Sequence, residues 1–324
     1  MSATEPAAVP TPRWSPRRLL SVVIKLATAA GLLGYVFWRV DLRAVSRVMA
    51  TADPSMLALA VVLSCLSFPL GGIRWWCVVR ALGETAAPRL LIGLFWLAGL
   101  VAQVLPNPMG DAVRISVAAR LGLGLGVAFR SAFLERVAML AGLAIFFAAT
   151  QPLLRARVGA ADPVWLAMTL LALGAAGLAM LASADLLLRR LRRFRVISAF
   201  ANLSGAFRRL VTSRWALPVL VTMFLSYLNT VAVAIVLGTA LALPLSAGDY
   251  LAVIPVAVLA TVLPVSIGGW GVREGVMLAL FSAMGVPAAS ALAFSLMLGL
   301  LGIVAALPGL LTLWHERLPP AGRG

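Results

Sequence analysis

The sequence predicts an all-α protein that spans a membrane several times. Three observations predict this class. The chain has 324 residues, of which 62% are hydrophobic and only 12% are charged, whereas globular chains are about 45–50% apolar. Long runs lack Asp, Glu, Lys and Arg altogether, and roughly 20 apolar residues suffice for a helix to cross a bilayer. The arginines are concentrated in short segments between these runs, as in the cytoplasmic loops of membrane proteins.

The apolar runs predict about six full spans and two interrupted segments. The runs at 90–105 and 250–263 are short, and each is closed by a proline. We expect each of them to form a re-entrant or broken helical hairpin, with opposite orientations, as in a pseudo-inverted repeat. If the short runs cross instead, the number of spans rises to about eight or more. The full spans are expected at about 19–40, 55–82, 127–150, 163–188, 215–243 and 288–314.

A single transmembrane domain is expected to occupy residues 19–314. The polar, Pro-rich segment 1–18 is predicted to be a disordered cytoplasmic N-terminus that precedes an uncleaved first span, and 315–324 is predicted to be a C-terminal tail. Segment 189–213 clusters arginines with recurring apolar residues. This pattern is typical of a basic helix in the membrane interface, although a simple topology anchor explains it equally well.

Arginine positions orient the chain with its N-terminus in the cytoplasm. Cations precede the first span and crowd segment 189–214, whereas loop 240–249 has none and is assigned to the outside. The three arginines of loop 39–47 oppose this scheme, which places that loop outside. A net charge of +16 would suggest a nucleic-acid partner for a soluble protein, but basic loops account for it here, so none is expected. The expected location is the cytoplasmic (inner) membrane of a bacterium.

Two stretches interrupt apolar runs with proline and glycine: LPNPMGDAVR at 105–114 and LPVSIGGWGVRE at 263–274. In both, a glycine follows four residues after a proline, and an arginine comes after it, which suggests a weak internal repeat. Irregular backbone cannot face lipid, because each unpaired N–H or C=O group costs several kcal/mol. We therefore expect both stretches to border a polar cavity near the membrane midplane, where broken helices of inverted repeats place substrate sites.

The candidate site residues are Asn107 and the ionisable side chains in or beside the apolar runs, because charges at membrane depth usually face the interior and mark a pathway. Asp111 and Arg114 are spaced to share a helix face, and Arg273 opens a helix, whose N-terminus attracts anions. These groups either form salt bridges that pin the hairpins to the spans or contact a lipid head group directly. Arg74 stands among tryptophans at the end of a span, a pattern typical of a membrane interface. The candidates are Arg74, Asn107, Asp111, Arg114, Glu135, Arg136, Arg273 and Glu274.

With LERV at 134–137 and GGIRWW at 71–76, these two stretches resemble the lysylphosphatidylglycerol synthase transmembrane-domain family, also called flippase-like integral membrane proteins. The resemblance extends over most of the chain. Relatives fused to a soluble aminoacyl-transferring domain move aminoacylated phospholipid between leaflets, and others accompany hopanoid or glycolipid pathways. The resemblance adds Gly110, Gly268, Gly269 and Gly271 to the candidate positions. The sequence stops at Gly324 without the soluble domain, so we do not expect this chain to make lysyl-lipid.

Residue patterns that are typical of metal or triad enzymes are missing from the sequence. His315 is the only histidine, and no HExxH, P-loop or CxxC spacing occurs. Cys65 and Cys77 are expected to be packing residues, and LGLGLG at 121–126 is expected to be a flexible cytoplasmic connector. No cofactor or metal is therefore expected, and with no ATP site visible, any transport would be passive or coupled to an ion.

Two classes of function remain after these exclusions. In the first, a lipid with an anionic or zwitterionic head group is bound or translocated, with Arg114 and Arg273 holding the head group. In the second, the protein is a membrane enzyme, for example in polyprenyl-linked glycosyl transfer, with Asp111 or Glu274 as the base. An accessory subunit that works with lipid-biosynthesis enzymes is a further alternative. The residues favour the first class.

Overall fold

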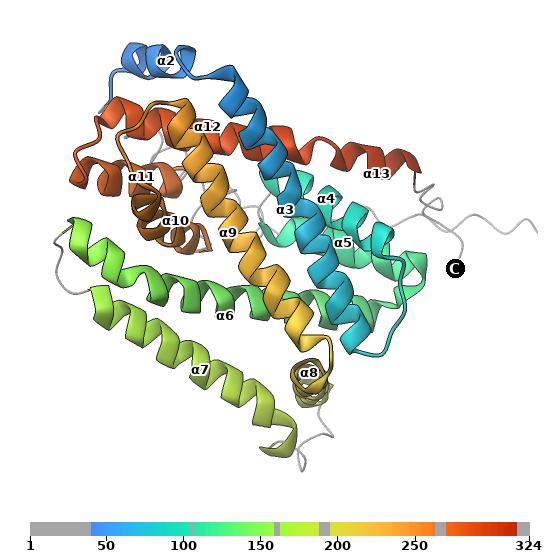
Figure 1. Ribbon diagram of the computed structural model, residues 1–324. Coiled ribbons are helices and arrows are strands. Elements are labelled where there is room, and N and C mark those ends of the chain that lie inside the picture. Colours follow the sequence, from blue (N-terminus) through green and yellow to red (C-terminus); the bar gives the residue numbers. More distant parts are fainter. Residues whose placement is uncertain (1–39, 105–106, 159–162, 188–194, 263–269, 316–324) are drawn as a thin grey trace, which may run out of the picture.

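The computed structural model describes residues 40–104, 107–158, 163–187, 195–262 and 270–315. Every regular element in these ranges is a helix (Figure 1), which confirms the predicted class. Most of the predicted first span, both terminal segments, Gly268 and Gly269 lie outside the described residues. The helices are α2 (Leu42–Ala50), α3 (Pro54–Ala81), α4 (Pro88–Val104), α5 (Asn107–Ala118), the π-helical turn η1 (Ala119–Leu123), α6 (Leu125–Val158), α7 (Pro163–Leu187), α8 (Arg195–Thr212), α9 (Ala216–Ala240), α10 (Ala247–Val262), α11 (Val272–Ala283), α12 (Ala288–Ala306) and α13 (Gly309–His315).

Four helical segments in the described residues are long and apolar enough to cross a membrane. They coincide with four of the predicted spans: Pro54–Ala81, Leu125–Arg157, Ala216–Ala240 and Ala288–Thr312. Shorter apolar helical segments cover Pro88–Gln103, Leu171–Ser183 and Ala247–Val262. The structure therefore describes a multi-span helical membrane protein, and the total of six spans stays a prediction.

The most extensive helix pairing joins α3 and α9, which run antiparallel along each other (Figure 1). At one end, the backbone N–H of Asp53, which caps α3, donates to the carbonyl oxygen of Ala240 at 2.9 Å. At the other end, Val78 of α3 and Val219 of α9 belong to one buried cluster. These two long helices form a central pair, and the shorter helices α4 and α10 follow α3 and α9 in the chain.

Helices α4 and α5 fold back on each other as a helical hairpin. Ala118, at the end of α5, lies in one buried cluster with Leu91 and Leu94, near the start of α4. Gly110 faces Ala98 so closely that an added Cβ would collide with its carbonyl oxygen. A glycine is therefore needed where the two helices touch.

Helices α10 and α11 form a second hairpin. The rings of Tyr250, near the start of α10, and Phe281, near the end of α11, pack edge to face at 6.1 Å. Gly271 begins α11 with a φ of 87°, a conformation that side chains disfavour. The described residues thus contain a hairpin at each of the two sequence stretches with interrupted runs.

The two hairpins start at opposite ends of the α3/α9 pair, because α4 follows the end of α3 and α10 follows the end of the antiparallel α9. Both hairpins approach α12, at two glycines that lie within one helical turn of each other. A Cβ on Gly302 would lie 3.3 Å from Nε2 of Gln103, in the last turn of α4. Gly299 faces Trp270 and Arg273, where α11 begins. The broken ends of both hairpins therefore meet at the same part of α12.

The remaining helices surround one side of this arrangement. Helix α6 ends beside the start of α10, where Nε of Arg157 and Oδ1 of Asp249 lie 2.8 Å apart. Helix α7 runs next to α6 at the edge of the molecule, and α8 lies across the far ends of α7 and α9 (Figure 1). The stretch 121–126, expected to be a flexible connector, forms the junction between η1 and α6, with non-helical angles at Leu121 and Gly122 and positive φ at Gly122 and Gly124.

Candidate functional site

The carboxylate of Glu135, on α6, joins two arginines from different helices. Its Oε1 accepts hydrogen bonds from Nε and Nη2 of Arg74, on α3, at 2.9 and 2.7 Å. Its Oε2 lies 2.9 Å from Nη2 of Arg114, on α5. All three side chains are at most 3% exposed. Because buried ions need partners, this bridge ties the first hairpin to two of the spans.

Asp111 extends the same network toward the surface. Its Oδ1 accepts from Nε of Arg114 at 2.9 Å, and its Oδ2 accepts from Nε of Arg136 at 2.8 Å. The predicted shared helix face of Asp111 and Arg114 is thus confirmed. We call the five residues Arg74, Asp111, Arg114, Glu135 and Arg136 the Glu135 cluster.

Neighbouring side chains fix the buried arginines in place. Arg74 also donates from Nη1 to the hydroxyl of Ser226, on α9, at 2.8 Å. The guanidinium of Arg114 lies over the rings of Trp75 and Phe95, at 4.8 and 5.0 Å from their centres, a favourable cation–π arrangement. Nη1 of Arg114 is buried and has no hydrogen-bond partner among the described residues. One donor of the cluster is therefore left unused in the interior.

The Glu135 cluster carries an excess of positive charge. Three guanidinium groups face two carboxylates, which leaves a formal charge of one. The arginines also differ in access: the side chain of Arg136 is 52% exposed, and that of Arg114 is 1% exposed. Only Nε of Arg136 has a partner among the described residues. Its two terminal amino groups have no partner within that part of the chain.

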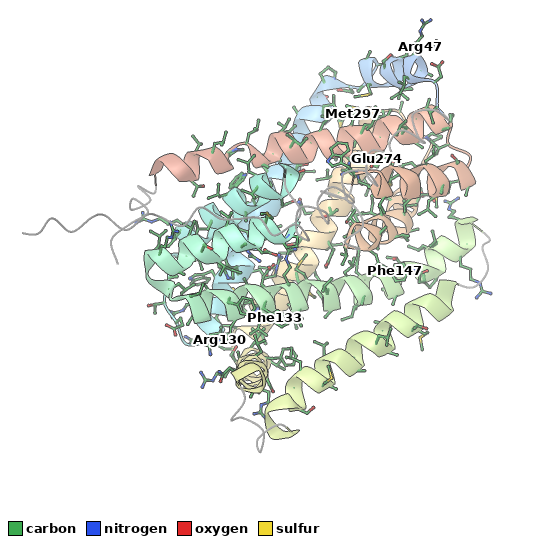
Figure 2. The ribbon with its side chains drawn as sticks, turned by 180° about the vertical axis from the view of Figure 1, so that it is seen from behind. Arg47, Arg130, Phe133, Phe147, Glu274 and Met297 are labelled. Carbon is green, nitrogen blue, oxygen red and sulfur yellow. The ribbon has the colours of Figure 1, made fainter. Side chains whose placement is uncertain are left out.

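A second polar group surrounds Glu274, in the first turn of α11. Arg273 donates from Nη2 to Oε1 of Glu274 at 2.7 Å, and the hydroxyl of Ser295, on α12, donates to the same oxygen at 3.3 Å. The Arg273 guanidinium lies 4.8 Å from the ring centre of Trp270. Glu274 is fully buried, beside α12 (Figure 2). This Glu274 cluster is charge-balanced, and it joins the second hairpin to α12.

The structure therefore groups the predicted residues into two sets. Arg74, which the sequence placed near a membrane interface, is buried within the protein together with Trp75, and Glu135 and Ser131 supply partners for their polar groups. Asn107 begins α5, but its side chain lies outside the part of the protein that the structure describes. Gly110 and Gly271 serve the hairpins themselves, through close packing and a positive φ.

Several contributing residues were not predicted. The hydroxyls of Ser226 and Ser295 support the arginines, yet isolated serines are common in apolar helices and give no signal. Phe95 and Trp75 stack on Arg114, and in the sequence they are ordinary apolar residues. No group of three or more metal-ligating side chains occurs in the residues that the structure describes.

A family model described as the lysylphosphatidylglycerol synthase TM region matches residues 22–309. The chain belongs to this family. The match covers both hairpins and both polar clusters, so the sequence resemblance is confirmed. The curated glycosyltransferase AglD of Haloferax volcanii is 32% identical over 121 residues, which make up 37% of this chain. The alignment spans only 19% of AglD, so most of that protein has no counterpart in the comparison.

Proposed function

We propose that this family member binds the phosphate-bearing head group of a membrane lipid at the Glu135 cluster and moves the lipid between leaflets. Arg136 carries the proposal. It lies about 16 Å along α6 from the first residue, Leu125, at 1.5 Å per residue, and its guanidinium is half exposed. Asp111 is already paired with its Nε at 2.8 Å, and the two terminal amino groups of the guanidinium can still pair with phosphate oxygens in a bidentate fork.

Two further features support an anionic or zwitterionic head group. The excess positive charge of the cluster attracts an anion without disturbing the internal salt bridges. In addition, Nη1 of Arg114 has no hydrogen-bond partner among the described residues. The sequence alone favoured Arg114 for head-group contact, but its side chain is nearly inaccessible. In the proposal, Arg136 makes the first contact, and Arg114 supports it from below.

The hairpins give the lipid a route. In the proposal they re-enter the membrane from opposite sides, between about six full spans, with the N-terminus in the cytoplasm and the protein in a bacterial inner membrane. Their ends meet at Gly299 and Gly302 of α12, where broken helices of a pseudo-inverted repeat would form the midplane part of a pathway. Movement would be passive or coupled to an ion. Lipid-biosynthesis enzymes are possible partners, because they make or use such lipids.

The similarity to AglD favours a second candidate function. AglD is described as a glycosyltransferase, so this chain would take part in glycosyl transfer to or from a polyprenyl-linked lipid. Within the Glu135 cluster both carboxylates already accept hydrogen bonds from arginines, so neither has an oxygen without a partner to offer as a base. The geometry therefore favours binding and transport over catalysis.

A translocation assay in vesicles tests the first proposal. The purified protein is reconstituted with fluorescent phosphatidylglycerol, and the label that crosses to the opposite leaflet is measured by chemical quenching. Loss of a charge-assisted hydrogen bond costs about 1.5–3 kcal/mol, so Arg136→Gln should slow translocation at least about tenfold. Arg130→Gln is the matched control, because Arg130 lies on the same helix and donates to the backbone of Gly126.

The proposal is supported if Arg136→Gln is slow and Arg130→Gln matches the wild type. Equal rates for all three proteins would reject the role of Arg136 in translocation. The second candidate is tested in parallel by adding a glycosyl donor and a polyprenyl-phosphate acceptor to the purified protein. Formation of a glycosylated lipid would favour the enzyme over the transporter.

A further inference from the structure

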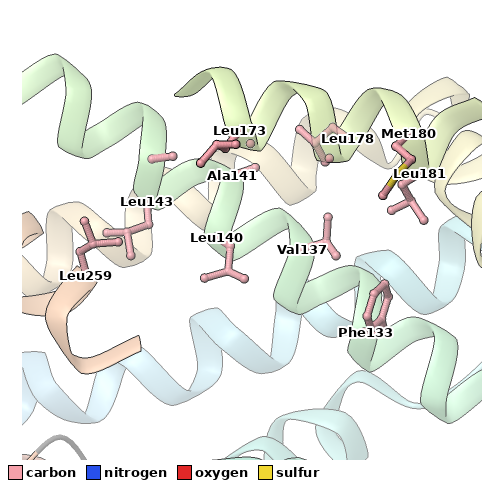
Figure 3. A pocket seen from close by; sticks show the side chains of 13 residues that line it. Phe133, Val137, Leu140, Ala141, Leu143, Leu173, Leu178, Met180, Leu181 and Leu259 are labelled. Carbon is pink, nitrogen blue, oxygen red and sulfur yellow. The ribbon is translucent and has the colours of Figure 1, made fainter. Parts of the chain in front are cut away.

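An apolar groove of about 750 Å³ separates α6 from α7 (Figure 3). Its volume lies within the range of about 300–1,000 Å³ that is usual for ligand sites. All thirteen lining residues are apolar, with no polar or charged side chain among them. They are Phe133, Val137, Leu140, Ala141, Leu143 and Ala144 of α6, Leu173, Gly174, Gly177, Leu178, Met180 and Leu181 of α7, and Leu259 of α10.

The groove begins beside the exposed cation of the Glu135 cluster. Arg136 follows Phe133 by three positions and precedes Leu140 by four, so it shares a side of α6 with both lining residues. Its half-exposed guanidinium therefore flanks the groove. A ligand that occupied the groove could reach the unpartnered amino groups of Arg136 without crossing another helix.

At its other end the groove reaches the second hairpin. Figure 3 shows Leu143 of α6 close to Leu259, in the last turns of α10, and Phe133 at the opposite end. From Phe133 to Leu143 the groove follows α6 for about 15 Å. It thus connects the surroundings of Arg136 with the end of α10, from which the second hairpin turns toward α12.

Glycines keep the α7 side of the groove open. Gly174 and Gly177 both line it, and a Cβ added to either would find no atom within 4 Å. Close helix packing is a common reason for such glycines in membrane helices, but no helix within the described ranges fills the space beside these two. The groove therefore stays open beside Gly174 and Gly177.

We propose that this groove holds a hydrocarbon chain of the lipid whose phosphate is bound at Arg136. The inference rests on the proposed function and adds the site of the acyl chain. An extended hydrocarbon chain matches a groove that is wholly apolar over about 15 Å. A single amphiphile also explains why a free cation adjoins a wholly apolar groove.

Photolabelling tests this assignment. The wild-type protein in phosphatidylcholine vesicles receives phosphatidylglycerol with a diazirine near the end of one acyl chain, and labelled residues are mapped by mass spectrometry. Label should concentrate on groove residues such as Leu140 and Leu178. The double variant Gly174→Leu/Gly177→Leu fills the groove and should lower this labelling about tenfold. Ala179→Leu is the matched control and should leave it unchanged, because Ala179 is exposed and no residue three or four positions from it lines the groove.

Ala141→Leu fills the groove from α6 and should reproduce the loss if the double variant does not fold. The assignment is overturned if groove labelling equals that on the outer face of α7, or if both filled variants label like the wild type. Cross-linking of the groove to a second copy of the chain would also overturn it. Groove labelling that persists while Arg136→Gln translocates normally would support the acyl site and reject the proposed head-group role, so the two failures are distinguishable.

Discussion

Arg74 and Glu135 are 61 positions apart in the sequence, yet Nη2 of the arginine lies 2.7 Å from Oε1 of the carboxylate in the interior. The same carboxylate holds Arg114 through its second oxygen. One acidic side chain thus serves as the shared counter-ion of two buried cations from two helices. This relationship determines which variants break the fold and which change only the proposed site.

Replacing Glu135 should severely destabilise the protein. Glu135→Ala leaves two buried guanidinium groups without their shared counter-ion, and breaking a buried ion pair costs about 3–5 kcal/mol. Little folded protein should survive size-exclusion chromatography in detergent, and its melting temperature should fall. Asp111→Asn, at a side chain that is 22% exposed, should lower the melting temperature less. A Glu135→Ala protein as stable as the wild type would contradict the assigned role of this bridge.

Gly299 should tolerate a large side chain poorly, because even a Cβ there meets Nη2 of Arg273 and the ring of Trp270, which would have to move. Overpacking of this kind typically costs about 1–3 kcal/mol, so Gly299→Leu should lower the melting temperature. Gly275→Ala is the control: it lies in the described part of α11 with open space around an added Cβ, and removing a helical glycine should stabilise by about 0.5–1 kcal/mol. Equal effects of the two changes would show that the Glu274 cluster is not packed as described.

Cysteine labelling should place the two ends of each hairpin on one side of the membrane. With Cys65 and Cys77 replaced by alanine, Glu84→Cys and Arg120→Cys flank the first hairpin, and Ala247→Cys and Ala283→Cys flank the second. A membrane-impermeant maleimide applied from outside should label only the second pair, since charge places loop 240–249 outside.

Labelling of Glu84→Cys and Arg120→Cys from different sides would mean that the first hairpin crosses the membrane. The re-entrant arrangement would then be wrong, and the number of spans would have to be revised. Labelling of both pairs from one side would instead contradict their opposite orientation.

Much of this arrangement could be predicted from the sequence. Pro106 and Pro264 mark where two apolar runs are interrupted, and the structure has a hairpin at each of these places. Charges at positions 135 and 136 within an apolar run indicated a buried polar site, since membrane helices rarely carry them without a partner. Local sequence patterns sufficed for these features, because a proline or a charge inside an apolar run can be recognised from the run itself.

Other features depend on packing between distant segments and could not be predicted. The proximity of tryptophans made Arg74 resemble an interfacial residue, and only the crossing of α3 and α6 brings it to Glu135. Sequence spacing favoured Arg114 for direct head-group contact, but the stacking rings of Trp75 and Phe95 cover it. The groove between α6 and α7 likewise arises from how two helices lie, and no short sequence stretch reports it.

Lipid binding to Arg136 tests the central claim most directly. Native mass spectrometry on the wild-type protein, titrated with phosphatidylglycerol, measures the dissociation constant, and Arg136→Gln, Arg136→Lys and Arg130→Gln are compared with it. The account predicts a dissociation constant at least about tenfold higher for Arg136→Gln, a smaller rise for Arg136→Lys and none for Arg130→Gln. Equal affinity of the wild type and Arg136→Gln for phosphatidylglycerol would contradict it.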